Sequence, residues 1–368
     1  MHLQRIHLTH FKNYEMEKTD FSPKVNCIVG LNGMGKTNLL DAIYYLCMCK
    51  SQFGTADRLV VQQGKDFFRL EGHFQKEDKN FKVAAKVIPR QKKEIELNGV
   101  IHQKLADHIG LFPVVMITPY DIDLGMEGSE IRRRFLDNSL AQIDTAYLSA
   151  LLAYNRILRQ RNAALKSFPP HQANHTLLDS LDEQLLTPGN LIHQKRVGFI
   201  KDLIPIFTAY YQEIASGQEV VDCVYKSSLL EQSLEQSLKE SREKDILLQR
   251  STVGIHKDDL QFLIKGHPLK KFASQGQLKS FILALKLAQY ELVKNNSHSL
   301  PLLLLDDIFD KLDQHRVRQL IQLLFQKEFG QIFFTDTQKD RLVKFIEPFG
   351  VEICQLEIEN GVLVRSEE

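Results

Sequence analysis

The feature that most constrains the fold is a glycine-rich segment near the start of the chain, residues 30–37 (Gly-Leu-Asn-Gly-Met-Gly-Lys-Thr). It satisfies the pattern G-x-x-x-x-G-K-[ST] at every fixed position. The apolar stretch 25–29 before it is typical of a short buried strand, and residues 38–46 after it have the apolar spacing of a helix. Strand, loop and helix in this order form the phosphate-binding loop of α/β nucleotide-binding proteins. The segment therefore predicts an α/β fold that binds a nucleoside triphosphate.

Each residue type in this loop has a part in holding phosphates. Gly30, Gly33 and Gly35 let the backbone N–H groups point at an anion, and the helix N-terminus adds its partial positive charge. Lys36 can reach the β- and γ-phosphates, and the Thr37 hydroxyl is placed to ligate Mg²⁺. The alternative is a glycine-rich turn with an incidental lysine, which the flanking strand and helix disfavour.

A second group of polar side chains follows a buried strand near the other end of the chain. Residues 302–305 are all leucine, and Asp306 and Asp307 come directly after them. At the carboxyl end of a parallel strand, the first carboxylate can hold Mg²⁺ through water, and the second can orient or deprotonate an attacking water. A core strand with ordinary acidic residues at its exit is the alternative. The upstream phosphate loop favours a catalytic role for Lys36, Asp306 and Asp307, with Thr37 and Asp306 as metal ligands.

The most discriminating segment precedes that strand. Residues 272–277 (Phe-Ala-Ser-Gln-Gly-Gln) lead into an expected helix. A serine hydroxyl, a glycine N–H and a helix N-terminus together form a good anion site, although a plain helix capped by Ser274 also explains the segment. The segment resembles the signature loop of the ATP-binding-cassette superfamily. That resemblance implies that Ser274, Gly276 and Gln277 bind the γ-phosphate of ATP held by a partner subunit, with Ser274 as a catalytic residue.

The apolar pattern changes twice along the chain. Short alternating runs predict strands at 3–11, 68–74 and 81–87, and a hairpin that turns at 98–99. Helical patterns then take over. They predict helices over 177–199 and 200–214, a helix break at Pro169-Pro170, and a polar helix or linker over 227–250.

Alternating strands and helices return from residue 259, beginning with a strand over 259–264. We therefore predict an α/β head whose N-terminal part is 1–125 and whose C-terminal part, with the signature and two-carboxylate motifs, is 251–368. A mostly helical insertion over 126–250 separates the two parts. No heptad pattern is sustained, so no long coiled coil is expected.

Composition gives only broad limits. The chain has 368 residues, 43% of them hydrophobic and 25% charged, with a formal net charge of +1, as in an ordinary soluble globular protein. The net charge of the chain therefore does not indicate a nucleic-acid partner. No apolar run is long enough to span a bilayer, and the amino terminus lacks a signal-peptide core. The cysteines form no paired C-x-x-C spacing, so we expect reduced thiols in a cytoplasmic protein without a membrane partner.

The motifs together resemble those of the RecF family, bacterial recombination and replication-repair ATPases that are short relatives of the SMC proteins. The resemblance covers essentially the whole chain. The matching segments are F-K-N-Y at 11–14, G-L-N-G-M-G-K-T-N at 30–38, R-R-R-F-L-D at 132–137, R-N-A at 161–163, G-I-H-K-D-D-L at 254–260, A-S-Q-G-Q at 273–277, L-L-D-D at 304–307 and L-D at 312–313. The resemblance extends the nucleotide-binding set to Gly30, Asn32, Gly33, Gly35, Lys36, Thr37, Asn38, Ser274, Gly276 and Gln277.

Two segments depart from the pattern expected of relatives, and a third departs from the pattern of transporters. Ile255 replaces a proline and Lys257 an arginine, which keeps the charge but loses the bidentate geometry. Val115 or Met116 stands where relatives carry a glutamine that senses Mg²⁺ and the γ-phosphate, so the role of that glutamine is in doubt here. Residues 334–337 stand where transporters carry a switch histidine, and the threonine at this place favours the RecF family.

The resemblance implies an ABC-type P-loop ATPase head, ATP and Mg²⁺ as cofactors, weak ATP hydrolysis and an ATP-dependent homodimer. It also implies binding of duplex DNA near single-strand gaps, and loading of recombinase through RecO and RecR in recombinational repair and replication restart. Two alternatives stay open: the ATPase subunit of a membrane transporter, and a binding module that uses ATP as a clamp without turnover. For DNA contacts the sequence offers only basic clusters that could equally be solvated faces, at 90–93, 132–134 and 156–161. The DNA-contacting residues are therefore left unknown.

Overall fold

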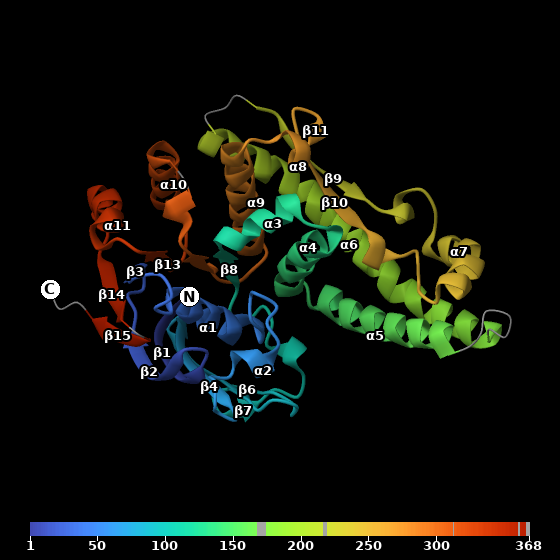
Figure 1. Cartoon of the computed structure of the whole chain (residues 1–368), viewed down its shortest axis with the longest axis horizontal. Coiled ribbons are helices and arrows are strands. Elements are labelled where there is room, and N and C mark those ends of the chain that lie inside the picture. Colours follow the sequence, from blue (N-terminus) through green and yellow to red (C-terminus); the bar gives the residue numbers. More distant parts are fainter. Residues whose placement is uncertain (168–173, 216–218, 312, 360, 366–368) are drawn as a thin grey trace. The chain divides into compact units, whose positions relative to one another are not determined.

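The computed structural model describes residues 1–167, 174–215, 219–311, 313–359 and 361–365 (Figure 1). The expected break at Pro169-Pro170 and the first residue of the L-D motif, Leu312, lie outside these ranges. The chain divides into two compact units. Unit 1 comprises Met1–Asp121, Tyr210–Gly217 and Lys279–Glu368, and unit 2 comprises Ile122–Ala209 and Gln218–Leu278.

The first sheet of unit 1 combines strands from both ends of the chain. Its order is β15-β14-β3-β13-β12-β8, in which only β15 pairs antiparallel. The strands are β3 (Val25–Val29), β8 (Val114–Ile117), β12 (Leu302–Leu305), β13 (Ile332–Asp336), β14 (Ile353–Glu359) and β15 (Val362–Arg365). The strands β3, β8, β12 and β13 are buried along their whole length, as in parallel sheets covered on both faces.

The second sheet of unit 1 is antiparallel, with the order β2-β1-β4-β5-β6-β7. Its strands are β1 (His2–Phe11), β2 (Tyr14–Asp20), β4 (Phe68–Lys76), β5 (Lys79–Val87), β6 (Glu94–Leu97) and β7 (Val100–Ile101). The predicted hairpin at 98–99 is confirmed, because Asn98 and Gly99 join β6 to β7 with φ values of 51° and 82°. Two positive φ values are what a tight two-residue hairpin turn requires.

The helix α1 (Lys36–Met48) packs against both sheets of unit 1 and is buried on nearly all sides. Its apolar side chains join strands of the two sheets in one core, which holds the helix N-terminus at the phosphate loop. The remaining helices of unit 1 are α2 (Asp57–Val60), α10 (Gln314–Gln326), α11 (Lys339–Ile346) and most of α9 (Gln275–Asn295).

Unit 2 is mostly helical, as predicted for the insertion. Its helices are α3 (Asp123–Met126), α4 (Ser129–Ile143), α5 (Thr145–Ser167), α6 (His175–Ala215, whose last residues belong to unit 1), α7 (Leu234–Leu248) and α8 (Leu269–Phe272). A three-stranded antiparallel sheet in the order β11-β10-β9 completes it, with β9 (Val221–Lys226), β10 (Asp259–Ile264) and β11 (His267–Pro268). The expected lobe limits 126 and 250 stay a prediction, but unit 2 continues to Leu278 and so contains the signature segment.

The predicted segments 177–199 and 200–214 are confirmed as helical, but the boundary between them was wrong. The segments 177–199 and 200–214 form one continuous helix, α6, which has Pro188 and Pro205 inside it. Phe199 and Ile200, at the predicted boundary, are both buried, so packing on either side keeps the helix intact. The polar segment 227–250 contains an ordered helix, α7, and the strand β9 before it was not predicted, because its pairing partner β10 is distant in the sequence.

Candidate nucleotide site

The phosphate loop closes around its own lysine. Lys36 is buried, and its Nζ donates hydrogen bonds to the carbonyl oxygens of Gly30 at 2.8 Å and Leu31 at 3.2 Å. The loop turns through Gly33 and Gly35, with φ values of 84° and 117° that favour glycine. A Cβ on Gly35 would lie 2.5 Å from the Asn13 amide nitrogen, whereas one on Gly33 would meet nothing within 4 Å. Gly35 is therefore fixed by packing, and Gly33 faces open space.

The loop and the two-carboxylate strand meet at the Thr37 hydroxyl. It lies 2.9 Å from both carboxylate oxygens of Asp306, although the two residues are far apart in the sequence. The strands bring them together, because β3, which leads into the loop, and β12, which Asp306 follows directly, both flank β13 in parallel. The structure therefore places the phosphate loop beside the strand-end carboxylate, as the sequence predicted.

Thr335 holds both carboxylates in place. Its hydroxyl oxygen lies 2.9 Å from Asp306 Oδ1 and 3.3 Å from Asp307 Oδ1, and it accepts the Asp307 backbone N–H at 2.8 Å. Asp307 has a φ of 41°, an unusual backbone conformation for a residue with a side chain. One carboxylate oxygen of Asp307 lies 4.0 Å from Lys36 Nζ. The sequence pattern named Thr335 only as part of the switch segment 334–337, whereas the strand register places it next to Asp306.

The charge balance at Asp306 favours a bound cation. Burial raises the pKa of Asp306 to about 6, and the nearby charge of Asp307 acts in the same direction, while hydrogen bonds from Thr37 and Thr335 oppose it. A carboxylate in this position lacks sufficient positive charge around it. The oxygens of Thr37 and Asp306 are the ligand type that Mg²⁺ prefers, so the residues present fit that ion.

The turn between β1 and β2 braces the phosphate loop. The Tyr14 hydroxyl donates to the Gly35 carbonyl at 2.9 Å, and the Asn13 amide donates to the Met34 carbonyl at 3.0 Å. The Asn38 amide in turn donates to Asn13 Oδ1 at 2.7 Å. Asn13 and Tyr14 belong to the F-K-N-Y segment, which gave the resemblance but was not assigned to the site. Asn38 was predicted to bind nucleotide, but one hydrogen of its side-chain amide is used in this contact with Asn13.

The signature segment forms a reciprocal cap at the start of α9. The Gln277 backbone N–H donates to Ser274 Oγ at 3.2 Å, and the Ser274 backbone N–H donates to Gln277 Oε1 at 2.6 Å. The Gln277 amide also donates to Glu219. Ser274 is exposed, and Gly276 is half-buried. These residues lie in unit 2, whereas the phosphate loop lies in unit 1, so their part in nucleotide binding stays a prediction.

Three of the arginines in the basic clusters hold unit 2 together. Arg161 is fully buried, and it pairs with Asp182 and Asp245. Arg132 pairs with Asp259 at 2.7 Å, and Arg133 donates to the Asp258 carbonyl. The motifs at 132–137 and 254–260 therefore meet each other in the fold.

The remaining residues singled out by sequence behave differently. Arg156 and Arg159 are exposed on α5. Val115 and Met116 are buried apolar residues of β8, so neither supplies the polar group of a glutamine. Ile255 is buried and Lys257 is exposed. Among the described residues, no helix has both the length and the apolar character needed to cross a bilayer.

Comparison with known proteins agrees with these motifs. Residues 2–359 match the family model described as the RecF/RecN/SMC N terminal domain. The DNA replication and repair protein RecF of Flavobacterium johnsoniae is 44% identical over 342 residues, which cover 93% of this chain and 95% of the relative. The protein of the same name from Cytophaga hutchinsonii is 41% identical over 367 residues, covering 100% of this chain and 97% of the relative.

A solved structure has the same fold over the whole chain. The structure of the recombination mediator protein RecF with ATP, in the RecFOR pathway, superposes with a TM-score of 0.90 at 30% identity, covering 100% of this chain and 98% of that one. The predicted α/β head with a helical insertion is thereby confirmed, and so is the resemblance drawn from the motifs. The chain belongs to the RecF family of DNA replication and repair proteins.

Proposed function

We propose that this chain is an ATP-dependent DNA-binding protein of recombinational repair and replication restart, with weak ATPase activity. The observation that carries the ATPase part of the proposal is the contact of Thr37 with both oxygens of Asp306, beside Lys36 and Asp307. Such a group of side chains is what binding and hydrolysis of a nucleoside triphosphate require. The relative with a solved structure is named as an ATP complex, which favours ATP as the nucleotide.

The chain's own residues would divide the chemistry between them. Lys36 exchanges its loop carbonyls for the phosphates of ATP, and Thr37 and Asp306 hold Mg²⁺, which neutralises phosphate charge when bound. Thr335 keeps Asp306 and Asp307 in fixed positions. Asp307, turned toward the site by its unusual backbone, orients the attacking water and accepts its proton.

The second half of the proposed mechanism needs another copy of the chain. Ser274 and Gly276 of one subunit close over the γ-phosphate bound by its partner, so ATP joins two heads in a dimer. The Ser274 hydroxyl already accepts from Gln277, which leaves its hydrogen available for a phosphate oxygen. The dimer holds duplex DNA near single-strand gaps, and hydrolysis releases it. RecR and RecO are the proposed partners in loading recombinase.

The alternative of a transporter ATPase is disfavoured, because relatives that match the whole length are DNA replication and repair proteins. A binding module that never hydrolyses ATP remains the competing proposal. Asp307→Asn separates the two: turnover should fall at least tenfold while ATP affinity is retained. Unchanged turnover would remove Asp307 from catalysis.

The first experiment measures ATP hydrolysis against protein concentration, with and without gapped duplex DNA. We expect a rate per subunit that rises with concentration and with DNA. Ser274→Arg should bind ATP but fail to dimerise or hydrolyse, whereas Lys36→Ala should lose ATP binding or turnover. Ser233→Arg, which disrupts the similar cap of α7, is the matched control and should hydrolyse normally. A rate per subunit that changes neither with protein concentration nor with DNA would be compatible with the ATP site but would contradict the DNA clamp.

A further inference from the structure

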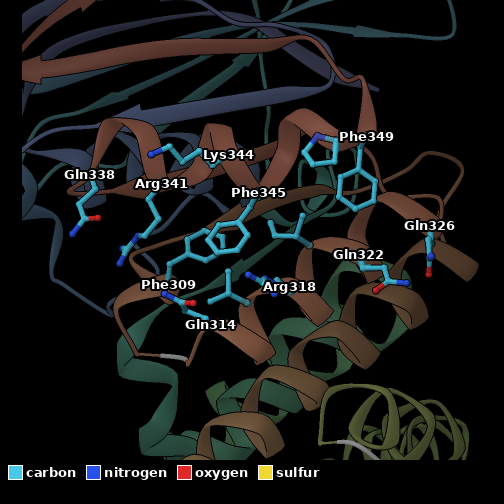
Figure 2. A pocket seen from close by; sticks show the side chains of 13 residues that line it. Phe309, Gln314, Arg318, Gln322, Gln326, Gln338, Arg341, Lys344, Phe345 and Phe349 are labelled. Carbon is cyan, nitrogen blue, oxygen red and sulfur yellow. The ribbon is translucent and has the colours of Figure 1, made fainter.

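A groove between α10 and α11 lies outside the nucleotide site. It has a volume of about 1170 Å³ and belongs entirely to unit 1. Figure 2 shows its lining, which comes from α10, from α11 and from the short helical turns at Ile308–Lys311 and Glu347–Phe349. We call it the α10–α11 groove.

The floor of the α10–α11 groove is apolar and aromatic. Phe309, Val317 and Ile321 are buried residues of the lining, which also includes the rings of Phe345 and Phe349 (Figure 2). Phe345 is half-buried, and Phe349 is 37% exposed although it stacks on Phe325. Water therefore reaches large aromatic surfaces whose burial would stabilise a complex.

The rim of the groove is cationic. Arg318 on α10 and Lys344 on α11 are both exposed, and neither forms an ion pair in the described part of the chain. Arg341, the third cation of the lining, pairs with Asp336. The lining contains no carboxylate among the described residues, and its other polar groups are the amides of Gln314, Gln322, Gln326 and Gln338. The groove therefore complements an apolar segment that carries negative charge.

The walls decide the backbone conformation of the occupant. Both walls are helices, whose backbone hydrogen bonds are satisfied internally, so the groove presents no strand edge to pair with. An extended peptide on the aromatic floor would leave its own backbone groups without partners, whereas a helix pairs them within itself. We propose that the α10–α11 groove docks an acidic amphipathic helix of a partner protein.

The mode of docking follows from the lining. Apolar side chains of the partner helix, spaced i, i+3 or i+4 and i+7, insert between Phe345 and Phe349 and reach Val317 and Ile321. Asp or Glu side chains flanking this stripe meet Arg318 on one wall and Lys344 on the other. Because these cations are exposed, they contribute mostly selectivity and association rate, and the aromatic floor contributes most of the affinity.

The test is a selection from a display library of helical peptides with a fixed apolar stripe and random charges at the flanking positions. The full chain is the target, without nucleotide, so the result does not depend on the proposed ATPase. We expect enriched peptides to be acidic at the flanks. A fluorescein-labelled copy of the most enriched peptide then gives the Kd by anisotropy.

Two variants and one control locate the binding site. Arg318→Glu combined with Lys344→Glu should weaken the peptide at least tenfold, and Phe349→Ser should do the same through the floor. Arg156→Glu combined with Arg159→Glu, an equal charge change on α5, should change the Kd less than twofold. Equal melting temperatures check that all variants fold. The proposal is overturned if no peptide is enriched, if the enriched peptides are neutral or basic, or if the rim variant binds as tightly as the parent. It is also overturned if the groove proves to be occupied by a second copy of the chain in solution.

Discussion

Tyr14 illustrates how a residue outside the phosphate loop can set its shape. It is fully buried, and the one hydrogen bond described for its hydroxyl goes to the Gly35 carbonyl. Gly35 precedes the first residue of α1, so this bond positions the helix N-terminus that receives the phosphates. The side chain therefore links the β1–β2 turn to nucleotide affinity.

Tyr14→Phe should weaken ATP binding by removing this hydrogen bond alone. A hydrogen bond of this kind contributes about 1 kcal/mol to stability. Tyr210→Phe removes a tyrosine hydrogen bond to Glu291 elsewhere in unit 1 and is the matched control. Both variants should lose similar stability in chemical denaturation, but only Tyr14→Phe should raise the Kd for ATP in a titration. Equal nucleotide affinity in the two variants would count against the brace.

His108 gives a residue-scale prediction on pH. Burial lowers the pKa of His108 to about 4, and its Nε2 lies 2.7 Å from the Leu46 carbonyl oxygen. An unfolded histidine titrates near 6.5, so between about pH 6.5 and 4 the unfolded chain binds a proton that the folded chain does not. The free energy of unfolding should therefore be at its full value above pH 6.5 and fall as the pH drops, by on the order of 3 kcal/mol in total.

His108→Gln keeps a donor near Leu46 but does not titrate. Urea unfolding at several pH values between 4.5 and 7.5 should show a shallower pH dependence in the variant than in the parent. If the two slopes are equal, the buried neutral histidine is not the source of the acid sensitivity.

At the scale of residues, the sequence pointed to the motif residues more readily than to the residues that hold them in place. Lys36, Thr37, Asp306 and Asp307 could be found because their motifs are local. Thr335 and Asn13 act through contacts that depend on strand register and on packing between distant segments, which no local pattern contains. The sequence placed Arg161 in a basic cluster, but in the structure it forms ion pairs with two buried carboxylates.

Among the elements, α9 and α7 share one way of starting. Ser274 caps the first and Ser233 the second, and in each a glutamine three residues later donates its backbone N–H to the serine hydroxyl. The two helices therefore have the same kind of N-terminal cap. Only the cap of α9 lies in the signature segment.

Replacing each serine by alanine separates capping from catalysis. Ser274→Ala and Ser233→Ala should each cost about 1 kcal/mol of stability, the usual value of a helix cap. Steady-state ATP turnover should fall only in Ser274→Ala. A similar loss of turnover in both variants would mean that helix stability, and not the signature serine, limits the reaction.

The predictions of helices and strands were correct where the apolar residues follow a single period. They were wrong where pairing with a distant segment determines the structure. The strand β4 alternates strictly and β1 nearly so, and α9 has clear helical spacing, so the pattern was sufficient. The strand β9 exists through its pairing with β10, and α6 continues past both of its prolines because apolar packing supports it. Neither cause can be read from a short window of sequence.

At the scale of the whole molecule, the parallel sheet of unit 1 makes the ends of the chain interdependent. The strands β3 and β8 come from the N-terminal segment, but β13 and β12 lie between them in the sheet. A fragment of residues 1–121 therefore leaves β3 without either of its neighbours, β14 and β13. It keeps the antiparallel sheet but loses part of the core around α1.

The isolated fragment 1–121 should not form a stable unit. We expect a broad thermal transition and fast amide exchange in α1, while addition of fragment 279–368 should restore slow exchange there. Hydrogen exchange followed by mass spectrometry measures both states. Slow exchange in α1 of the lone fragment would show that the antiparallel sheet suffices.

The same interleaving affects how the protein is made. A ribosome delivers β3 and α1 early, but the strands on both sides of β3 are translated only after the entire helical insertion. Unit 2, in contrast, is complete once Leu278 has emerged. During synthesis the apolar faces of β3 and α1 must therefore wait without their final neighbours, and the nucleotide site, which needs Thr37 beside Asp306, is assembled among the last parts of the molecule. A nascent chain stalled before β12 is consequently a natural client for chaperones that shield apolar surfaces.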